Sequence, residues 1–300
     1  MINVAVLGST GMLGSTLTRC LENNSTTVYE FNRAGISVTK KNESRKLDVV
    51  TDNDITKSFN GIKLDYIINC IGLIKQLINI KDPNSIKLAY KINSDFPLKL
   101  NNFAKSSGIP VIQIGTDCVY SGEVGAYAED QPHDPTDVYG ITKSMGEIES
   151  SSTMIVRCSI IGKEIESSNS LLSWVLSQNT NFRINGFTNH FWNGVTTLHF
   201  SQIISGIIES ETYMNGVFHL VPDGFVSKYE LIKLIAKKFG RSDLQVSKFE
   251  AETEINRSLI TINPQRNLSL WQNGGYNIIP TIEEMVSTYA LWTKSELIKN

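Results

Sequence analysis

The sequence predicts an α/β fold built on a doubly wound parallel sheet, and three observations support this prediction. Short apolar runs alternate with helical patterns along the first half of the 300-residue chain. These runs are continuously apolar, which is typical of strands buried on both faces of a parallel sheet. The first run leads directly into a glycine-rich turn and a helical pattern, as in a Rossmann fold. Right-handed βαβ crossovers would join these strands into one sheet.

In the first half of the chain, five strands are expected from the apolar runs, at residues 3–7, 27–31, 65–71, 110–115 and 154–161. An amphipathic helix follows the first strand and continues to Leu21. A longer helix is predicted over residues 85–106, where the helical pattern ends just before Gly108.

The alternation changes after Gly162. Helices are expected at residues 170–177, 202–209 and 227–239, a strand at 217–221, and an irregular aromatic stretch at 182–197. Ser227 and Glu230 have the spacing of a capping box for the third helix. The tail, residues 255–300, is expected to hold a strand-like segment, a loop and a helix near 282–292. Because no linker marks a boundary, we predict that a second, smaller α/β domain is interleaved with the first.

Composition excludes several classes of protein. Apolar residues make up 41% and charged residues 19%, as in ordinary globular proteins. The formal net charge is −2, and this lack of a basic excess argues against a nucleic-acid-binding protein. The cysteines and histidines are dispersed, and no metal-binding spacing is visible. Neither a signal peptide nor a membrane-spanning run is expected, which predicts a cytoplasmic protein.

The glycine turn has the spacing GxxGxxG over Gly8, Gly11 and Gly14. Gly8 allows a tight turn, Gly11 lets the backbone approach a pyrophosphate, and Gly14 lets the helix pack closely on the strand. The N-terminus of the helix then presents free N–H groups to the phosphates. This motif predicts dinucleotide binding.

The end of the second strand should contact the adenosine ribose. An acid there favours NAD, whereas an arginine suits the 2′-phosphate of NADP. Asn32 stands at the position of the acid and Arg33 follows it, which favours NADP(H) over NAD(H). Glu30 is the alternative: with the register displaced by two residues, it would be the acid.

Tyr139 and Lys143 form a YxxxK pair that shares one face of a helix, with Thr136 or Asp137 near its N-terminal cap. A nearby ammonium should favour the phenolate and lower the pKa of the tyrosine toward neutrality. The pair therefore predicts proton transfer. Thr116 follows a predicted strand, at the edge where open α/β sheets bind ligands, and its hydroxyl can bind a substrate carbonyl.

Together these motifs resemble the extended short-chain dehydrogenase/reductases, and more narrowly the dTDP-4-dehydrorhamnose reductase branch, whose members make deoxysugars. The resemblance rests on GSTGMLG (8–14), LDVVTD (47–52), GTDCVYSG (115–122), the stretch 127–147 and VRCSIIG (156–162). It implies an NADP-binding Rossmann domain, at 1–162 plus about 190–222. It also implies a small domain that closes over a nucleotide-sugar, at about 163–189 plus 223–300.

The resemblance also implies roles for individual residues. Tyr139 would be the proton donor, Lys143 its activator and a ligand of the nicotinamide ribose, and Thr116 the partner of the carbonyl. Cofactor contacts would come from Gly8, Thr10, Gly11, Met12, Leu13, Asn32, Arg33, Asp48, Val49, Cys70, Ile71, Gly72, Tyr139 and Lys143. Of these, the segment 48–49 would flank the adenine and 70–72 would line the path under the nicotinamide.

Substrate contacts are expected from Asp117, Cys118, Trp192, Asn193 and Arg257, with Arg266 as an alternative cation for the diphosphate. The chain departs from the family at Gly115, where the family often has serine. It departs again at Cys118, where the family commonly has an aromatic residue that helps to hold the sugar. Tyr120 or Trp192 is then the alternative source of an aromatic contact.

These expectations predict NADPH-dependent reduction of a 4-keto group on a nucleotide-activated deoxysugar, in polysaccharide or glycan precursor synthesis. Two alternatives stay open: an epimerase or dehydratase of the same superfamily, and a non-catalytic NADP-binding regulatory subunit. Dehydratases usually place Asp-Glu after the threonine, whereas here Asp117 precedes Cys118. A homodimer is compatible with the resemblance, and no metal, nucleic acid or membrane partner is expected.

Overall fold

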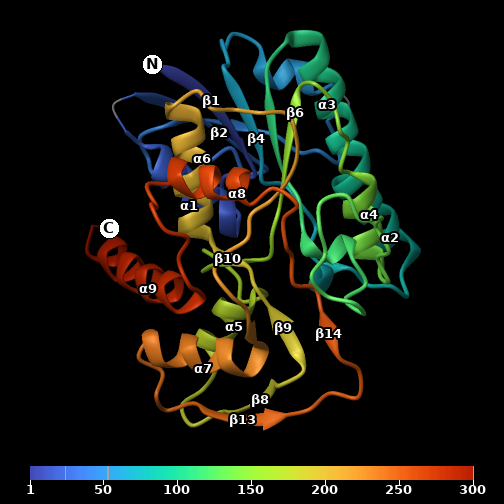
Figure 1. Ribbon diagram of the computed structural model, residues 1–300. Helices are drawn as coiled ribbons and strands as arrows, with labels where there is room; N and C mark the ends of the chain where they lie inside the picture. Colours follow the sequence, from blue (N-terminus) through green and yellow to red (C-terminus); the bar gives the residue numbers. More distant parts are fainter. Residues whose placement is uncertain (24, 53, 300) are drawn as a thin grey trace.

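The computed structural model describes residues 1–23, 25–52 and 54–299. Asn24 and Asn53, which fall in the predicted first domain, and Asn300, the predicted end of the second, lie outside the described residues. Figure 1 shows a large parallel sheet with helices on both sides, and a smaller lobe that contains α5 (Leu171–Ser177) and α7 (Lys228–Lys238).

The large sheet has seven strands in the order β11-β6-β5-β4-β1-β2-β3, and every neighbouring pair is parallel. The strands are β1 (Ile2–Leu7), β2 (Thr26–Asn32), β3 (Glu43–Lys46), β4 (Tyr66–Asn69), β5 (Val111–Ile114), β6 (Thr153–Arg157) and β11 (Gly216–His219). The chain runs from β1 to β3 in one direction and then crosses to β4 on the other side of β1. The predicted doubly wound sheet is therefore confirmed, with its switch point between β1 and β4.

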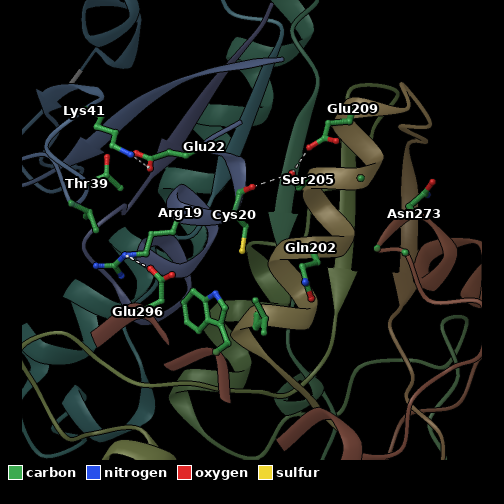
Figure 2. A pocket seen from close by; sticks show the side chains of 16 residues that line it. Arg19, Cys20, Glu22, Thr39, Lys41, Gln202, Ser205, Glu209, Asn273 and Glu296 are labelled. Atoms are coloured by element: carbon green, nitrogen blue, oxygen red, sulfur yellow. Dashed lines mark hydrogen bonds and ion pairs between the residues drawn. The ribbon is translucent and has the colours of Figure 1, made fainter. Parts of the chain in front are cut away.

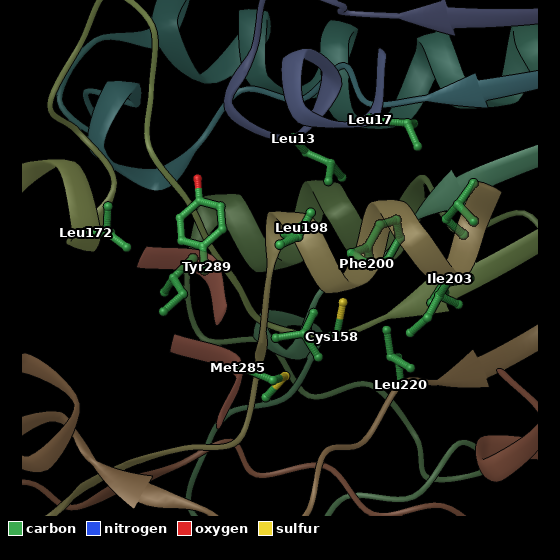
Figure 3. Packing of buried hydrophobic residues seen from close by; sticks show 14 of the residues in the cluster. Leu13, Leu17, Cys158, Leu172, Leu198, Phe200, Ile203, Leu220, Met285 and Tyr289 are labelled. Atoms are coloured by element: carbon green, nitrogen blue, oxygen red, sulfur yellow. The ribbon is translucent and has the colours of Figure 1, made fainter. Parts of the chain in front are cut away.

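Both faces of this sheet are covered. Alternate residues of β1 point to opposite sides, with Val4 and Val6 in one apolar cluster and Ala5 and Leu7 in another. The first cluster lies under α1 (Met12–Leu21) and α6 (Thr197–Glu209), and the second under α3 (Phe96–Ser107). Figure 3 shows part of the first cluster, where Leu13 and Leu17 of α1 lie opposite Leu198 of α6. This double covering explains why the strands read as continuous apolar runs.

The predicted long helix over 85–106 is wrong in one respect, because a π-helical turn interrupts it. The chain forms α2 (Pro83–Tyr90), the turn η3 (Lys91–Asp95) and then α3. Asn93 in this turn hydrogen-bonds Leu73 through both its amide oxygen and its amide nitrogen, and it donates to Thr142 Oγ1 at 3.1 Å. The turn thus joins the loop after β4, through Leu73, to helix α4 (Val138–Met145), through Thr142, which periodicity alone does not reveal.

The smaller lobe contains strands where an irregular stretch was expected, so that expectation is wrong. Residues 182–197 form β8 (Arg183–Phe187), β9 (His190–Trp192) and β10 (Val195–Thr196). Their partners lie far away in the sequence, which hid them: β8 pairs with β13 (Gln245–Phe249), and β9 pairs with β12 (Val226–Ser227) and β14 (Ile255–Asn256). The expected strand at 154–161 is likewise split, because β7 (Ile160–Ile161) leaves the large sheet to pair with β10.

The C-terminal part contains a helix that periodicity did not predict, α8 (Pro264–Asn273), followed by α9 (Ile282–Lys299). A Cβ at Gly206 of α6 would lie 1.7 Å from the Asn273 carbonyl oxygen, so α8 packs directly on the helices of the large sheet. The predicted capping box of α7 is present, with reciprocal hydrogen bonds between Ser227 and Glu230. The exact division into two interleaved domains stays a prediction. Within the described residues, no helix is long and apolar enough to cross a membrane.

Candidate active site

The glycine turn lies at the carboxyl end of β1, beside the end of β4. Gly8 has a φ of +81°, and a Cβ on it would lie 3.0 Å from Ile71 Cγ1. A Cβ on Gly14 would lie 2.1 Å from the Gly8 carbonyl oxygen, so only glycine permits this packing of helix on strand. Gly11 is the N-cap of α1 and supplies no capping side chain. The first N–H groups of α1 are thus available to an anion, which fits a dinucleotide pyrophosphate.

The register of β2 decides between the two candidates for the ribose. Leu7 pairs with Phe31, so Asn32 lies beside the glycine turn and Glu30 lies two residues back, paired with Val6. The Glu30 carboxylate is fully buried and accepts hydrogen bonds from Ser37, Val38 and Asn42. The alternative in which Glu30 contacts the ribose is therefore wrong.

Asn32 and Arg33 have different environments. The buried amide of Asn32 donates to Ser9 Oγ at 2.9 Å and to the Ile36 carbonyl at 2.7 Å. It thereby joins the glycine turn to the loop after β2. The Arg33 side chain is exposed next to it. An exposed guanidinium at this edge is available to a phosphate.

The remaining predicted cofactor residues also follow the ends of strands. Asp48 accepts a hydrogen bond from the Val50 N–H, and Val49 is buried. Cys70 follows β4 and donates its N–H to the Leu7 carbonyl.

The other predicted cofactor residues lie on α1 or on the surrounding turns. Met12 lies against Gly162, because a Cβ at Gly162 would be 3.1 Å from Met12 Cγ. The Leu13 side chain lies in the apolar core, so only its backbone is available to a cofactor. Thr10, Ile71 and Gly72 lie on the surrounding turns and are at least partly exposed.

Helix α4 (Val138–Met145) positions the YxxxK pair. Asp137 is the N-cap and accepts from the Gly140 N–H at 2.9 Å, which confirms the predicted cap. The same carboxylate pairs with Lys75 at 2.8 Å and so joins the helix to the loop after β4. A Cβ on Gly140 would lie 2.2 Å from the Cys118 carbonyl oxygen, so the glycine lets α4 approach the segment that follows β5.

The Tyr139 phenol and the Thr116 hydroxyl meet at the carboxyl end of β5. Thr116 is buried and caps the short helix η4 (Asp117–Val119), and its hydroxyl lies near enough to the Tyr139 phenol to act on the pKa of that group. Burial raises the pKa of Tyr139 above its ordinary value, and the neighbouring Cys118 adds to the effect. The expected lowering of this pKa by Lys143 is thus wrong, because desolvation of the phenolate outweighs any stabilisation by the ammonium. The phenol is consequently protonated at neutral pH, as a proton donor must be.

Lys143 lies beneath this pair and is directed inward. It is buried, and its ammonium donates to the Ile114 carbonyl at 2.7 Å. Burial lowers the pKa of Lys143, while the negative charge of Glu147, which lies just past the end of α4, raises it. The Lys143 charge also acts on Cys70 at the end of β4, where it lowers a thiol pKa that burial raises. The Lys143 side chain therefore extends from α4 toward the ends of β4 and β5. It lies next to the residues predicted to line the nicotinamide path.

The predicted substrate residues fall into two groups. Asp117 Oδ1 lies 3.2 Å from Thr116 Oγ1 and 3.5 Å from Cys118 Sγ, which places both residues beside Tyr139. Burial raises the pKa of Cys118 to about 12, so its sulfur is a thiol at neutral pH. Arg257 Nε donates to the Tyr120 carbonyl at 2.9 Å, and the Arg257 charge acts on Cys118. Arg257 therefore also lies near this group.

The other substrate candidates have structural partners. Trp192 is buried, and its indole N–H donates to Ser159 Oγ at 2.8 Å. Asn193 holds Leu259 through two hydrogen bonds, and Arg266 lies over the Phe218 ring. Tyr120 is wrong as a source of aromatic contact, because it is fully buried with its hydroxyl bound to the Ala128 carbonyl and Arg157.

Sequence reasoning missed a buried ion pair behind Lys143. Arg157 Nε donates to Glu147 Oε2 at 2.7 Å, and both side chains are almost fully buried. The other Glu147 oxygen, Oε1, is buried without a hydrogen-bond partner among the described residues. A Cβ at Gly115 would lie 2.9 Å from this oxygen and 2.8 Å from Arg157 Cγ, which explains the departure from serine there. One feature of the sequence could have revealed this ion pair. Arg157 stands in an otherwise apolar strand, and a buried arginine requires a charged partner.

Lys228, at the start of α7, is the second residue that the sequence did not indicate as functional. The charges of Asp117 and Arg257 act on its pKa, so it lies at the same site although its helix belongs to the smaller lobe. The capping box located the start of the helix, but only the chain path places Lys228 near Asp117.

A cavity of about 750 Å³ lies elsewhere, between α1, α6 and the C-terminal helices (Figure 2). Most of its charged lining residues are paired with each other, Arg19 with Glu296 and Lys41 with Glu22. Glu209 instead accepts hydrogen bonds from Asn23 and Ser205. None of the predicted catalytic residues lines it. Among the described residues, histidine, cysteine and acidic side chains form no group of three that could hold a metal ion.

Comparisons with known proteins agree with this fold and these motifs. Residues 2–258 match the model of the RmlD substrate binding domain family. A dTDP-4-dehydrorhamnose reductase of Streptomyces griseus is 29% identical over 143 residues, which cover 47% of this chain and 42% of that protein. The spore coat polysaccharide biosynthesis protein SpsK of Bacillus subtilis is 24% identical over 245 residues, which cover 80% of each chain.

Solved structures show the same fold at low sequence identity. A dTDP-4-dehydrorhamnose reductase from Clostridium acetobutylicum has a TM-score of 0.75 and 21% identity, over 98% of this chain and 100% of that one. The enzyme of the same name from Bacillus anthracis, solved in complex with NADP, has a TM-score of 0.76 and 20% identity over the same shares. With the family match extending over most of the sequence, the chain belongs to the RmlD substrate-binding domain family, within the extended short-chain dehydrogenase/reductases.

Proposed function

We propose that the protein is an NAD(P)-dependent oxidoreductase that reduces the 4-keto group of a nucleotide-activated deoxysugar. The observation that supports this most directly is the contact between the Tyr139 phenol and Thr116, with Lys143 beneath and the glycine turn two strands away. The matched relatives are named as a dTDP-4-dehydrorhamnose reductase and a polysaccharide biosynthesis protein. We therefore place the reaction in the synthesis of a polysaccharide or glycan precursor.

Reduction of a carbonyl requires a hydride on carbon and a proton on oxygen. A bound nicotinamide supplies the hydride. The Tyr139 phenol donates the proton to the carbonyl oxygen, because its raised pKa keeps it protonated. The Thr116 hydroxyl orients that oxygen, and the Lys143 ammonium places positive charge near the site where the phenolate develops.

The chain's own residues fit a dinucleotide at the carboxyl edge of the sheet. The free N–H groups at the start of α1 would bind the pyrophosphate. Arg33, beside Asn32, would bind a 2′-phosphate, and Lys143 would bind the nicotinamide ribose. Met12, Asp48, Val49, Cys70, Ile71 and Gly72 would line the rest of this path.

Replacing Arg33 with alanine should reduce the preference for NADPH. We expect KM for NADPH to rise about 10-fold, because a charge-assisted contact to the 2′-phosphate contributes about 1.5 kcal/mol. KM for NADH should stay within about 2-fold. Steady-state rates with both cofactors measure this, with Lys46→Ala, an exposed cation on the neighbouring strand β3, as the control. Equal changes for both cofactors would remove Arg33 from cofactor selection.

The proposed activity is tested by NADPH oxidation with a panel of dTDP-, UDP-, GDP- and CMP-linked 4-keto sugars. We expect turnover with at least one of them and an alcohol product two mass units heavier than the ketone. Product formation without net NADPH oxidation would favour an epimerase or dehydratase. Binding of NADPH and sugar without turnover across the panel would favour a regulatory subunit.

A further inference from the structure

Two cations lie on either side of β9 in the smaller lobe. In the antiparallel pair with β12, Val226 pairs with Trp192 and Ser227 with Phe191; Lys228 is the next residue. In the parallel pair with β14, Asn256 pairs with Phe191, and Arg257 is the next residue. Strand pairing alone thus brings together two basic residues that are 29 positions apart in the sequence.

The Lys228 side chain is held in place by an aromatic ring. Its Nζ lies 5.7 Å from the centroid of the Trp192 ring, and the Trp192 indole N–H is fixed by Ser159. This cation–π contact satisfies one face of the ammonium. None of the ion pairs among the described residues includes Lys228. The ammonium therefore keeps its hydrogen-bond donors for another group.

Arg257 is anchored from the opposite side. Its Nε donates to the Tyr120 carbonyl, and Gly122 leaves room for its Cγ at 3.0 Å from the position of a Cβ. Its two Nη groups donate no hydrogen bond among the described residues. The Lys228 and Arg257 charges oppose each other, and the Asp117 carboxylate acts on Lys228. A second carboxylate that Arg257 reaches, Asp137, is neutralised by its own ion pair with Lys75. Two cations beside one carboxylate leave a net positive charge in front of the catalytic residues.

We propose that Lys228 and Arg257 together bind an anionic oxygen group of the substrate, either the diphosphate of the nucleotide-sugar or a carboxylate on its sugar. Lys228 is the new member of this anion site, and the inference rests on the proposed function. Bringing two cations together is unfavourable unless an anion compensates them, and charge-assisted hydrogen bonds to phosphate or carboxylate provide that compensation.

The site is tested by calorimetric titration of the full chain, saturated with NADP⁺, with UDP, dTDP, UDP-glucose and UDP-glucuronic acid. Lys228→Met should weaken binding by roughly 10- to 100-fold, because a charge-assisted contact is lost while the apolar stem is kept. Lys228→Arg should stay within about 3-fold of the wild type. Lys233→Met removes an exposed lysine from the same helix and should change nothing. Thermal melts check that each variant is folded.

The four ligands distinguish the two sources of the anion. Weaker binding of all the ligands that the wild type binds indicates the diphosphate. A loss confined to UDP-glucuronic acid indicates the sugar carboxylate. Equal affinities of wild type and Lys228→Met, or no binding of any of these ligands to the wild type, would overturn the anion site. Because no turnover is measured, Lys228-dependent binding by a protein that reduces no keto sugar would count against the proposed reaction and not against the anion site.

Discussion

Tyr139→Phe should lower kcat by roughly 10²- to 10⁴-fold, the usual contribution of a positioned general acid. The phenol is the group at the carboxyl edge of β5 that contacts Thr116 and carries a proton at neutral pH. Phenylalanine keeps the ring and removes only the hydroxyl, so the affinity for NADPH and the melting temperature should change little. Single-turnover rates with saturating NADPH measure the effect directly.

Tyr213→Phe is the matched control for this substitution. Tyr213 packs against Tyr66, and its buried hydroxyl has no hydrogen-bond partner among the described residues. Removing that hydroxyl should leave kcat unchanged and the stability equal or slightly higher. If Tyr139→Phe retained near wild-type turnover, the proton would have to come from another group, and the proposed mechanism would be wrong.

Arg157→Met should lower the free energy of unfolding by about 3–5 kcal/mol, because it leaves the Glu147 carboxylate buried without its cation. The pair is 3–4% exposed. Arg157 also donates to the Tyr120 hydroxyl at 2.8 Å and to the Glu129 carbonyl at 3.2 Å. The same change should also raise the pKa of Lys143, because Arg157 would no longer compensate the Glu147 charge that acts on this lysine. Urea unfolding with fluorescence and circular dichroism measures the loss.

A double-mutant cycle separates the buried charge from the lost packing. Glu147→Leu combined with Arg157→Met should be less destabilised than the sum of the two single variants, because neither charge is then left unpaired. Strict additivity would show that the ion pair contributes no coupling energy. Lys41→Met is the control, since the Lys41 side chain is 78% exposed and the loss of its ion pair with Glu22 should cost less than about 1 kcal/mol.

Local patterns were sufficient wherever a feature depends on neighbours in sequence. The glycine turn, the strand that precedes it, the Asp137 cap and the Ser227 capping box each lie within a few residues, and each was predicted correctly. Periodicity failed where a partner is distant. Strands β8 and β9 pair with β13 and β14, and the π-turn at Asn93 is held by Leu73 and Thr142.

The candidate site shows the same division. YxxxK and Thr116 were recognisable because their spacing or their place after a strand has a chemical reason. The raised pKa of Tyr139 was not, because it depends on how much water the surrounding loops exclude. The Glu147–Arg157 pair and the approach of Lys228 to Asp117 also need the chain path.

The sequence by itself therefore determined the parallel sheet and the glycine turn, and it indicated the candidate proton-transfer residues, since each depends on short-range spacing and apolar runs. Tertiary structure alone decided which charges are buried, which strands complete the smaller lobe and which cations face Asp117. The physical reason is that burial and electrostatic interaction depend on distance in space, and residues such as Asp117 and Lys228 become neighbours only after the sheet and the smaller lobe have packed together.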